Sequence, residues 1–229
     1  MKTSNIEVGY VNHMGDDLSV VNAARVSFHK ESEYEKNGKF GGTDTDISDK
    51  DAKLIKYLAK HKHFSPFNHA FITLRIKAPI FVARQLVKHK FMPWNEVSRR
   101  YVDEEPEFYI PDAWRCKADN VKQGSSNIPH HLSDQYSGRL AIEVSNSVEL
   151  YTEMLEDGIA PEQARMVLHQ NMMTEWWWSG TLGAYTDMLR LRLDPHTQYE
   201  SRIVAQKARA IIEPLFPFSV PALLGEINE

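Results

Sequence analysis

The chain has 229 residues, which is enough for one domain of ordinary to large size and does not require a second. Its formal net charge of −4 and pI near 6.2 argue against wholesale nucleic-acid binding, for which a basic excess is expected. The single cysteine, Cys116, excludes an internal disulfide framework, and no apolar run suits a signal peptide or a spanning helix. We therefore expect a cytoplasmic protein, or one made in a host cytosol if it is viral.

Short strands and amphipathic helices are predicted for the N-terminal part of the chain. In chain order they are a strand over 5–12, a helix from Asp16 or Asp17 to about Ser27, a polar loop over 30–47, a helix over 49–62, a strand over 70–78 and a helix from 80, with Pro79 before it as a first helical residue, to about 90. Ser48 and Asp51 resemble a capping box, which marks the start of a helix. Between Ala70 and Ala78 apolar and polar residues alternate, as in a half-buried strand.

The C-terminal part begins with a loop-rich stretch and continues mainly as helices. The predicted elements are a short strand at 108–110 within the loop-rich stretch 106–128, a helix over 133–157 closed by Gly158, a helix opened by Pro161, a strand over 172–178, a helix over 182–193 and a helix over 198–213. Thr197 and Glu200 resemble a further capping box. Helices with few strands and no repeat or linker predict one α+β domain over 1–229, with a small central sheet flanked by helices.

Three consecutive tryptophans, Trp176, Trp177 and Trp178, lie in the predicted strand over 172–178. They are most simply core and interface residues. Because neighbouring residues of a strand point to opposite faces, at least one ring must lie opposite the others. A second buried surface, such as a subunit interface, would accommodate that ring.

The densest polar stretch covers residues 84–101. If it begins as a helix, Arg84 and Lys88 lie on one face. Gln85 and His89 then lie on the adjacent face. A cationic pair and a hydrogen-bonding pair therefore both end at the same end of the helix. Several cations in a net acidic chain are typical of an anion site. A solvated helix face with a core-lining glutamine is the simpler alternative, and composition alone favours it.

Other polar residues are less informative when each is considered alone. Arg165, Arg190 and Arg192 form a second cationic set, but an arginine near a helix C-terminus is usually a favourable contact with the helix dipole. His63 and His69 lie six residues apart with no cysteine and no closely spaced partner, so we predict no metal site.

Taken together, seven segments of the chain resemble the flavin-dependent thymidylate synthase family. They occur in the family's order and with similar spacing, from Asp17 to about Ala208. The segments are 22–28, 63–67, 77–85, 95–101, 107–111, 164–168 and 191–200. Any one of these matches is weak, but seven in order are specific.

The resemblance implies an enzyme that reductively methylates dUMP to dTMP, with methylene-tetrahydrofolate as carbon donor, FAD as hydride carrier and NADPH as reductant. It also implies a homotetramer with active sites where subunits meet, and no nucleic-acid polymer or membrane as partner. The residues in dUMP-binding positions are Gln85, Lys88, Glu96, Ser98, Arg99, Arg100, Arg165 and Arg192. The residues in FAD-binding positions are Ser27, Ser65, Lys88, His89, Lys90, Glu96, Thr181 and Asp187. The resemblance makes Arg192 the catalytic cation that stabilises the ionised uracil ring, and places His63, also catalytic, beside the folate and flavin rings.

The chain departs from the family's pattern mainly in its flavin half. The family's Arg-His-Arg signature reads Lys88-His89-Lys90 here, which keeps the charge but loses the planar fork of arginine. The other departures are Asn68, Thr181, Gly183 and Asp187. An aspartate near the flavin pyrophosphate would repel it unless turned aside or bridged. Two alternatives stay open: a relative that hydroxymethylates a pyrimidine nucleotide, and a catalytically silent nucleotide-binding homologue.

Overall fold

The computed structural model describes residues 1–35, 46–102, 104–119 and 124–225. Most of the loop expected over 30–47, namely 36–45, lies outside the described residues, as do 120–123 of the loop-rich stretch.

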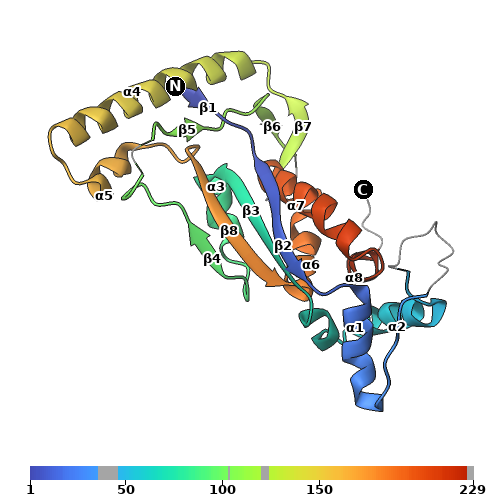
Figure 1. Ribbon diagram of the computed structural model, residues 1–229. Coiled ribbons are helices and arrows are strands. Elements are labelled where there is room, and N and C mark those ends of the chain that lie inside the picture. The colour runs from blue at the N-terminus through green and yellow to red at the C-terminus, as the bar shows by residue number, and fades with distance from the viewer. Residues whose placement is uncertain (36–45, 103, 120–123, 226–229) are drawn as a thin grey trace.

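A four-stranded antiparallel sheet forms the centre of the fold (Figure 1). Its strands, in spatial order, are β2 (Glu7–Met14), β3 (Phe71–Pro79), β8 (Met173–Thr181) and β4 (Trp94–Glu96). The expected α+β class is confirmed, and the three long strands fall within a few residues of their predicted bounds. The sequence missed β4, because three residues are too few to establish an alternating pattern. The domain division 1–229 stays a prediction.

Two smaller sheets lie near one end of the central sheet, beside α4 (Ser133–Glu156) (Figure 1). In one, β1 (Lys2–Thr3) pairs in parallel with β5 (Glu107–Phe108), close to the short strand predicted at 108–110. In the other, β6 (Arg115–Lys117) pairs with β7 (Ser125–Pro129). β6 and β7 fall in the stretch that we expected to be loop-rich, because its polar residues show no alternation of apolar and polar side chains.

Helices cover one face of the central sheet and both of its ends (Figure 1). They are α1 (Asp17–Arg25), α2 (Asp49–Lys60), α3 (Ile80–Leu86), α4 (Ser133–Glu156), α5 (Pro161–Ala164), α6 (Leu182–Arg192), α7 (Tyr199–Ile212) and α8 (Ser219–Leu224). The short 3-10 turns are η1 (Val26–Phe28), η2 (Ser65–Asn68), η3 (Arg165–Val167) and η4 (Glu213–Leu215). Within the described ranges, none of the helices has the length and apolar character needed to cross a membrane.

Several predicted helix boundaries were wrong for identifiable reasons. Pro79 ends β3 rather than opening α3, and α3 stops at Leu86 instead of about Lys90. No capping box begins α7: the Thr197 hydroxyl donates to the carbonyl of Leu191, and Glu200 pairs with Arg115. Distant partners therefore compete successfully for the two side chains that would have formed the local cap.

Two other predicted boundaries are confirmed. The Ser48 hydroxyl accepts a hydrogen bond from the backbone N–H of Asp51 and so caps α2. Gly158 follows α4 with a φ of +83°, a left-handed conformation that glycine adopts without strain.

The strand pattern places the core on one side of the sheet. Trp176 and Trp178 are 1% and 0% exposed and pair with Ile76 and Leu74 of β3, whose side chains are also fully buried. Trp177 points to the other face and is 53% exposed. The predicted alternation of the tryptophans is thus confirmed, whereas a subunit interface over Trp177 stays a prediction.

Candidate active site

Arg192 lies at the C-terminal end of α6 and joins two segments that are distant in sequence. Its Nε donates to Nε2 of His89 at 3.0 Å, and one Nη donates to the main-chain carbonyl of Gln85 at 3.2 Å. The Gln85 amide in turn donates to Gln198 and accepts from the Ser201 hydroxyl at 3.1 Å. We call these five residues the Arg192 cluster.

Burial and charge define the protonation of the Arg192 cluster. Burial, together with the nearby charge of Arg192, lowers the pKa of His89 to about 4. His89 is therefore neutral near pH 7, and its Nε2 accepts from Arg192 because a guanidinium can only donate. The other Nη of Arg192 makes no hydrogen bond to any residue that the structure describes. It is thus available to a ligand.

A second group of predicted site residues lines a cavity of about 590 Å³ at the corner of the sheet, which we call the corner pocket. Glu96, Arg99 and Arg165 line it, and Arg84 projects into it from α3. Glu96 is held in place, because its two carboxylate oxygens accept from the Thr174 hydroxyl at 2.7 Å and from the indole of Trp94 at 3.0 Å.

The corner pocket holds only part of the predicted dUMP set. Arg192 does not line the corner pocket, and neither do Ser98 and Arg100, which bond to each other. Gln85 points from α3 toward α7, whereas the preceding Arg84 lines the pocket. Among the described residues, Arg165 lines the corner pocket, whereas Arg100 and Arg192, which the resemblance also assigns to dUMP, do not.

Four of the residues predicted to bind FAD lie near the C-terminal end of β8. Lys88 and Lys90 are exposed in the turn after α3. Soon after this turn, Met92 lies so close to Gly180 that a Cβ added at Gly180 would come within 3.1 Å of its side chain. The next residue, Thr181, contacts η2, which contains Ser65. Two lysines and two hydroxyls thus lie at one end of the sheet.

Three departures from the family's pattern belong to a single contact. The Thr181 hydroxyl donates to Oδ1 of Asn68 at 2.8 Å. A Cβ at Gly183 would lie only 2.6 Å from the same oxygen, so a glycine leaves room for Asn68. The three departures are therefore structurally consistent with one another.

Asp187, a fourth departure from the pattern in this half, pairs with a cation. Its carboxylate accepts from Arg190 at 3.0 Å, three residues further along α6. The repulsion that a free aspartate would exert on a nearby phosphate is thereby reduced.

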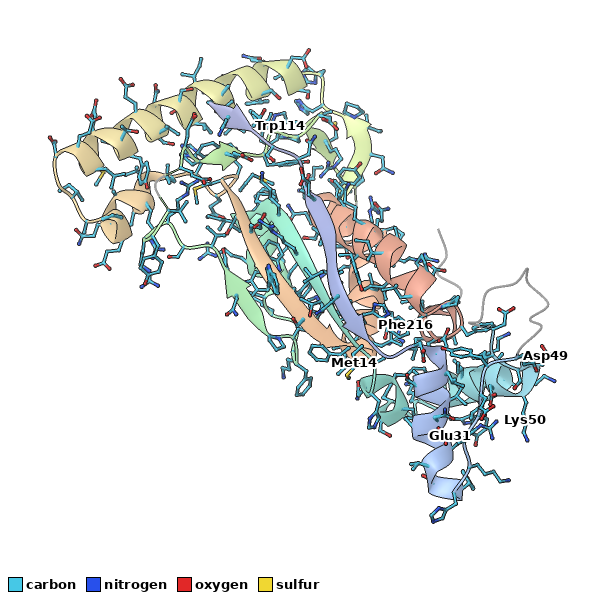
Figure 2. All side chains as sticks on the ribbon, viewed as in Figure 1. Met14, Glu31, Asp49, Lys50, Trp114 and Phe216 are labelled. Atoms are coloured by element: carbon cyan, nitrogen blue, oxygen red, sulfur yellow. The ribbon has the colours of Figure 1, made fainter. Side chains whose placement is uncertain are left out.

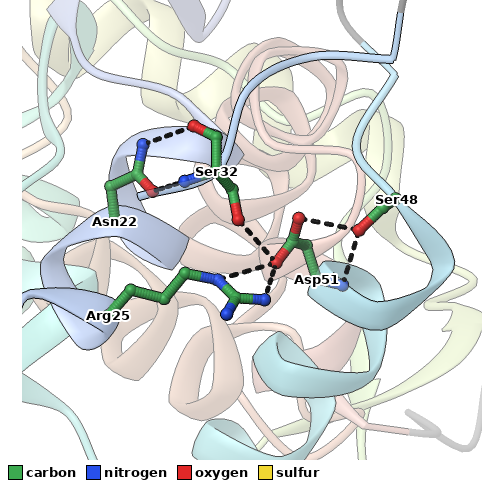
Figure 3. Close-up of polar contacts among 5 residues, drawn as sticks. All are labelled: Asn22, Arg25, Ser32, Ser48 and Asp51. Carbon is green, nitrogen blue, oxygen red and sulfur yellow. Dashed lines mark hydrogen bonds and ion pairs between the residues drawn. The ribbon is translucent and has the colours of Figure 1, made fainter. Parts of the chain in front are cut away.

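Ser27 lies in η1, within a segment whose two ends are held by a buried carboxylate (Figure 3). Oδ1 of Asp51 accepts from Nε of Arg25 at 3.0 Å and from the Ser32 hydroxyl at 3.1 Å, while Oδ2 accepts from the Ser48 hydroxyl at 2.7 Å. We call this set, with Asn22, the Asp51 latch.

Asn22 completes the Asp51 latch by pairing with the main chain of Ser32. Its amide donates to the Ser32 carbonyl at 3.0 Å, and its oxygen accepts the Ser32 N–H at 2.8 Å. The residues between them are thus closed into a loop that presents the exposed Ser27. The sequence predicted only the pairing of Ser48 with Asp51. The contacts of Arg25, Asn22 and Ser32 across the loop followed no sequence pattern.

His63 is exposed just before η2, beside Tyr57 and His61. In the described ranges, no three His, Cys, Asp or Glu side chains gather in a way that could hold a metal ion.

Sequence reasoning assigned no role to Gln198 and Ser201, although Gln198 falls in a matching segment. The only sequence clue to these two residues was Gln85, because its amide needs hydrogen-bond partners once it points into the protein.

Comparison with known proteins decides the family. A family model described as "Thymidylate synthase complementing protein" matches residues 10–218. The chain belongs to the flavin-dependent thymidylate synthase family. The enzyme class expected from the resemblance, a flavin-dependent methyltransferase, is confirmed with it.

Flavin-dependent thymidylate synthases of bacteria resemble this chain over most of its length. The one from Thermosipho africanus is 36% identical over 215 residues, covering 93% of this chain and 89% of the relative. The one from Thermus thermophilus is 41% identical over 207 residues, covering 90% of this chain and 70% of the relative.

Among solved structures, the UMP/dUMP methylase PolB from Streptomyces cacaoi is similar in fold. Its complex with 5-Br dUMP has a TM-score of 0.80 at 30% identity and covers 97% of this chain and 96% of PolB. Its complex with 5-Br UMP has a TM-score of 0.83 at 27% identity and covers 98% of this chain and 96% of PolB.

Proposed function

We propose that this chain methylates dUMP to dTMP, taking the carbon from methylene-tetrahydrofolate and the reducing equivalents from NADPH through FAD. The observation that carries the proposal is the Arg192 cluster. A half-buried guanidinium is held by a neutral imidazole and a carbonyl, and one of its nitrogens stays free. The complexes of PolB with 5-Br dUMP and 5-Br UMP support a uracil nucleotide, and the relatives named thymidylate synthases support dUMP in particular.

Arg192 suits the chemistry of the uracil ring. Carbon 5 of uracil is a poor nucleophile until the ring gains negative charge. A cation fixed before the reaction stabilises that charge as it develops, without the cost of reorganising water. His89 is neutral and Gln85 contributes a carbonyl, so neither cancels the positive charge of Arg192. Both hold its guanidinium in place.

The residues of the flavin half fit FAD. Cationic and hydroxyl side chains suit a pyrophosphate, and the charge of Asp187 is balanced by Arg190. The proposed FAD set is Ser27, Ser65, Lys88, His89, Lys90, Glu96, Thr181 and Asp187. When bound, the flavin supplies the hydride; the protein's part is to bind and align it. His63, the second proposed catalytic residue, would act beside the folate and flavin rings when both are bound.

We further propose that the active site is completed by other copies of the chain in a homotetramer. The separate positions of the corner pocket and the Arg192 cluster support this, since a single copy leaves the dUMP residues apart. The proposed dUMP set is Gln85, Lys88, Glu96, Ser98, Arg99, Arg100, Arg165 and Arg192. The exposed Trp177 offers a surface for a neighbouring copy.

Purified protein should be yellow, or become so with added FAD, and should oxidise NADPH faster when dUMP and methylene-tetrahydrofolate are present. Absorbance spectra and the mass of the nucleotide product check this prediction. The mass of dTMP supports the proposal, whereas a hydroxymethylated product would favour the hydroxymethylase. Absence of any turnover with saturating FAD would favour the silent homologue.

Replacing Lys88 and Lys90 together with arginine should raise the affinity for FAD roughly tenfold, the equivalent of one further charge-assisted hydrogen bond. The planar guanidinium can form two parallel bonds to a phosphate, which an ammonium group cannot. Titration with FAD, followed by flavin fluorescence, measures the change. The matched control replaces the exposed Lys53 and Lys56 of α2 with arginine and should leave the affinity unchanged. Equal or weaker binding by the first variant contradicts the account.

A further inference from the structure

Three of the five tryptophans form one group of rings in contact, which we call the tryptophan cluster. The ring of Trp94 stacks on that of Trp176, with centroids 4.3 Å apart and planes tilted by 18°, and meets the ring of Trp178 edge-on at 5.8 Å. The pairing of β4 with β8 brings them together, since Trp94 lies opposite Trp178. The ring of His89 lies 6.1 Å from that of Trp178. The cluster therefore extends from β4 to a residue of the proposed FAD set.

The three indoles of the tryptophan cluster differ in where their N–H groups point. Nε1 of Trp94 donates to the carboxylate of Glu96 at 3.0 Å. Nε1 of Trp176 and Nε1 of Trp178 are buried and have no hydrogen-bond partner among the described residues. An indole is a donor only, so it needs a base at its N–H before it can release a proton. Within the cluster, that base is present at Trp94.

An electron vacancy in the tryptophan cluster is best stabilised on Trp94. An indole that has lost an electron is a cation and a much stronger acid than indole itself. The negative charge of Glu96 stabilises the cation, and the same carboxylate can then accept the proton, which leaves a neutral radical. The side chain of Glu96 is exposed, so the proton can pass on to solvent. The stacked ring of Trp176 shares the vacancy while the proton leaves.

The neighbouring Tyr185 does not offer a competing end to the cluster. Its ring lies 5.8 Å from that of Trp178, but its hydroxyl donates to the backbone carbonyl of Trp178 at 2.6 Å. Burial raises the pKa of Tyr185 above its ordinary value, which shows that its surroundings oppose loss of the phenolic proton. A carbonyl oxygen is a far weaker base than a carboxylate. The vacancy therefore stays on the tryptophans.

We propose that the tryptophan cluster donates an electron to the bound flavin under light, entering beside His89 at Trp178 and ending at Trp94. The oxidant is oxidised flavin excited by blue light, since flavins accept single electrons. Trp178 gives one electron to it and regains one from Trp94, whose Nε1–H bond breaks with the proton passing to Glu96. In sum, the flavin gains one electron, and Trp94 loses one electron and one proton. This light-driven activity goes beyond methylation but rests on the FAD site of the proposed function.

Electron paramagnetic resonance and transient absorption on the FAD-loaded protein test the proposal. The sample contains no NADPH, dUMP or oxygen and is illuminated with blue light. A long-lived neutral tryptophan radical is expected. No tryptophan radical, or a tyrosine radical in its place, overturns the proposal. If the radical forms in protein that makes no dTMP, the proposed function fails and the relay stands; dTMP formation without the radical refutes the relay alone. Protein that takes up no FAD contradicts both.

Variants locate the radical. Trp94→Phe keeps an aromatic ring but removes the N–H, so the long-lived signal should be lost. Two controls make the same change outside the cluster and should keep the signal: Trp177→Phe, on the opposite face of β8, and Trp114→Phe, below α4 (Figure 2). A neutral tryptophan radical that persists in folded Trp94→Phe, or is lost in folded Trp177→Phe, overturns the proposal.

A change at the proton acceptor tests the same relay without altering the rings. Glu96→Gln keeps an acceptor oxygen but removes the base, so the tryptophan radical should remain a cation and decay faster by return of the electron. Because Glu96 belongs to the proposed FAD set, the spectra are compared at saturating FAD. Thermal unfolding shows whether each variant is folded, and Glu96→Gln decides the matter if Trp94→Phe is not. An unchanged neutral radical in Glu96→Gln contradicts the assigned proton transfer.

Discussion

Replacing Arg192 with alanine is expected to lower kcat for dUMP methylation by roughly 10²–10³-fold, as the loss of one preorganised charge donor does in other enzymes. The guanidinium is held by His89 and by the Gln85 carbonyl, so it requires no rearrangement as charge develops on the uracil ring. Without it, the ring would develop negative charge beside a neutral imidazole. Steady-state rates with saturating dUMP and FAD measure the effect.

Two further variants separate the role of Arg192 from general damage. Arg192→Lys keeps a charge but loses the second contact, so its kcat should lie between those of alanine and arginine. Arg209→Ala removes a surface arginine that pairs with Glu213 near the end of α7 and should keep kcat within about twofold of the parent. An Arg192→Ala protein that is folded and turns over at a near-normal rate would refute the electrostatic role.

The second large effect concerns stability. Asp51→Ala should lower the free energy of unfolding by about 3 kcal/mol, because it leaves Arg25 partly buried without its counter-charge. The side chains of Asp51 and Arg25 are 4% and 14% exposed, so water replaces the lost contacts poorly. Urea unfolding with and without the substitution gives the difference. The exposed loop that carries Ser27 should loosen at the same time, and the affinity for FAD should fall.

The control for Asp51 is a pair of the same kind near the surface. Glu213→Ala breaks the ion pair with Arg209, in which both side chains are about one-third exposed, and should cost less than about 1 kcal/mol. Equal losses in the two variants would contradict the importance of burial in the Asp51 latch.

The Asp51 latch should also depend on pH in a defined direction. Burial raises the pKa of Asp51, but the hydrogen bonds from Arg25, Ser48 and Ser32 outweigh it and hold the pKa below its ordinary value. The unfolded chain then binds the proton more readily than the folded one. The stabilisation is complete above the ordinary carboxyl range near pH 4 and is lost as the pH falls through the folded pKa.

The sequence predicted well wherever a single segment carries its own pattern. The alternation from Ala70 to Ala78 specified both the strand and its buried face, and the same rule placed Trp177 opposite its two neighbours. The family segments, which keep residue types in a fixed order, were sufficient to identify the family. These features depend on the spacing and order of residues along the chain, which can be read before the chain folds.

The sequence predicted poorly wherever a side chain or short strand depends on a distant partner. β4 forms only because β8 offers it an edge, and Thr197 and Glu200 leave their local cap for Leu191 and Arg115. Local propensity does not decide such cases, because the competing contacts exist only after the chain has folded.

For this protein, sequence alone therefore determined the α+β class, the buried faces of the long strands and the family. Only the tertiary structure decided that Arg192 meets His89 across 103 residues and that Asp51 closes the loop around Ser27. The physical reason is that periodicity is a property of neighbouring residues, whereas hydrogen bonding and desolvation depend on which atoms the folded chain brings within about 3 Å of each other.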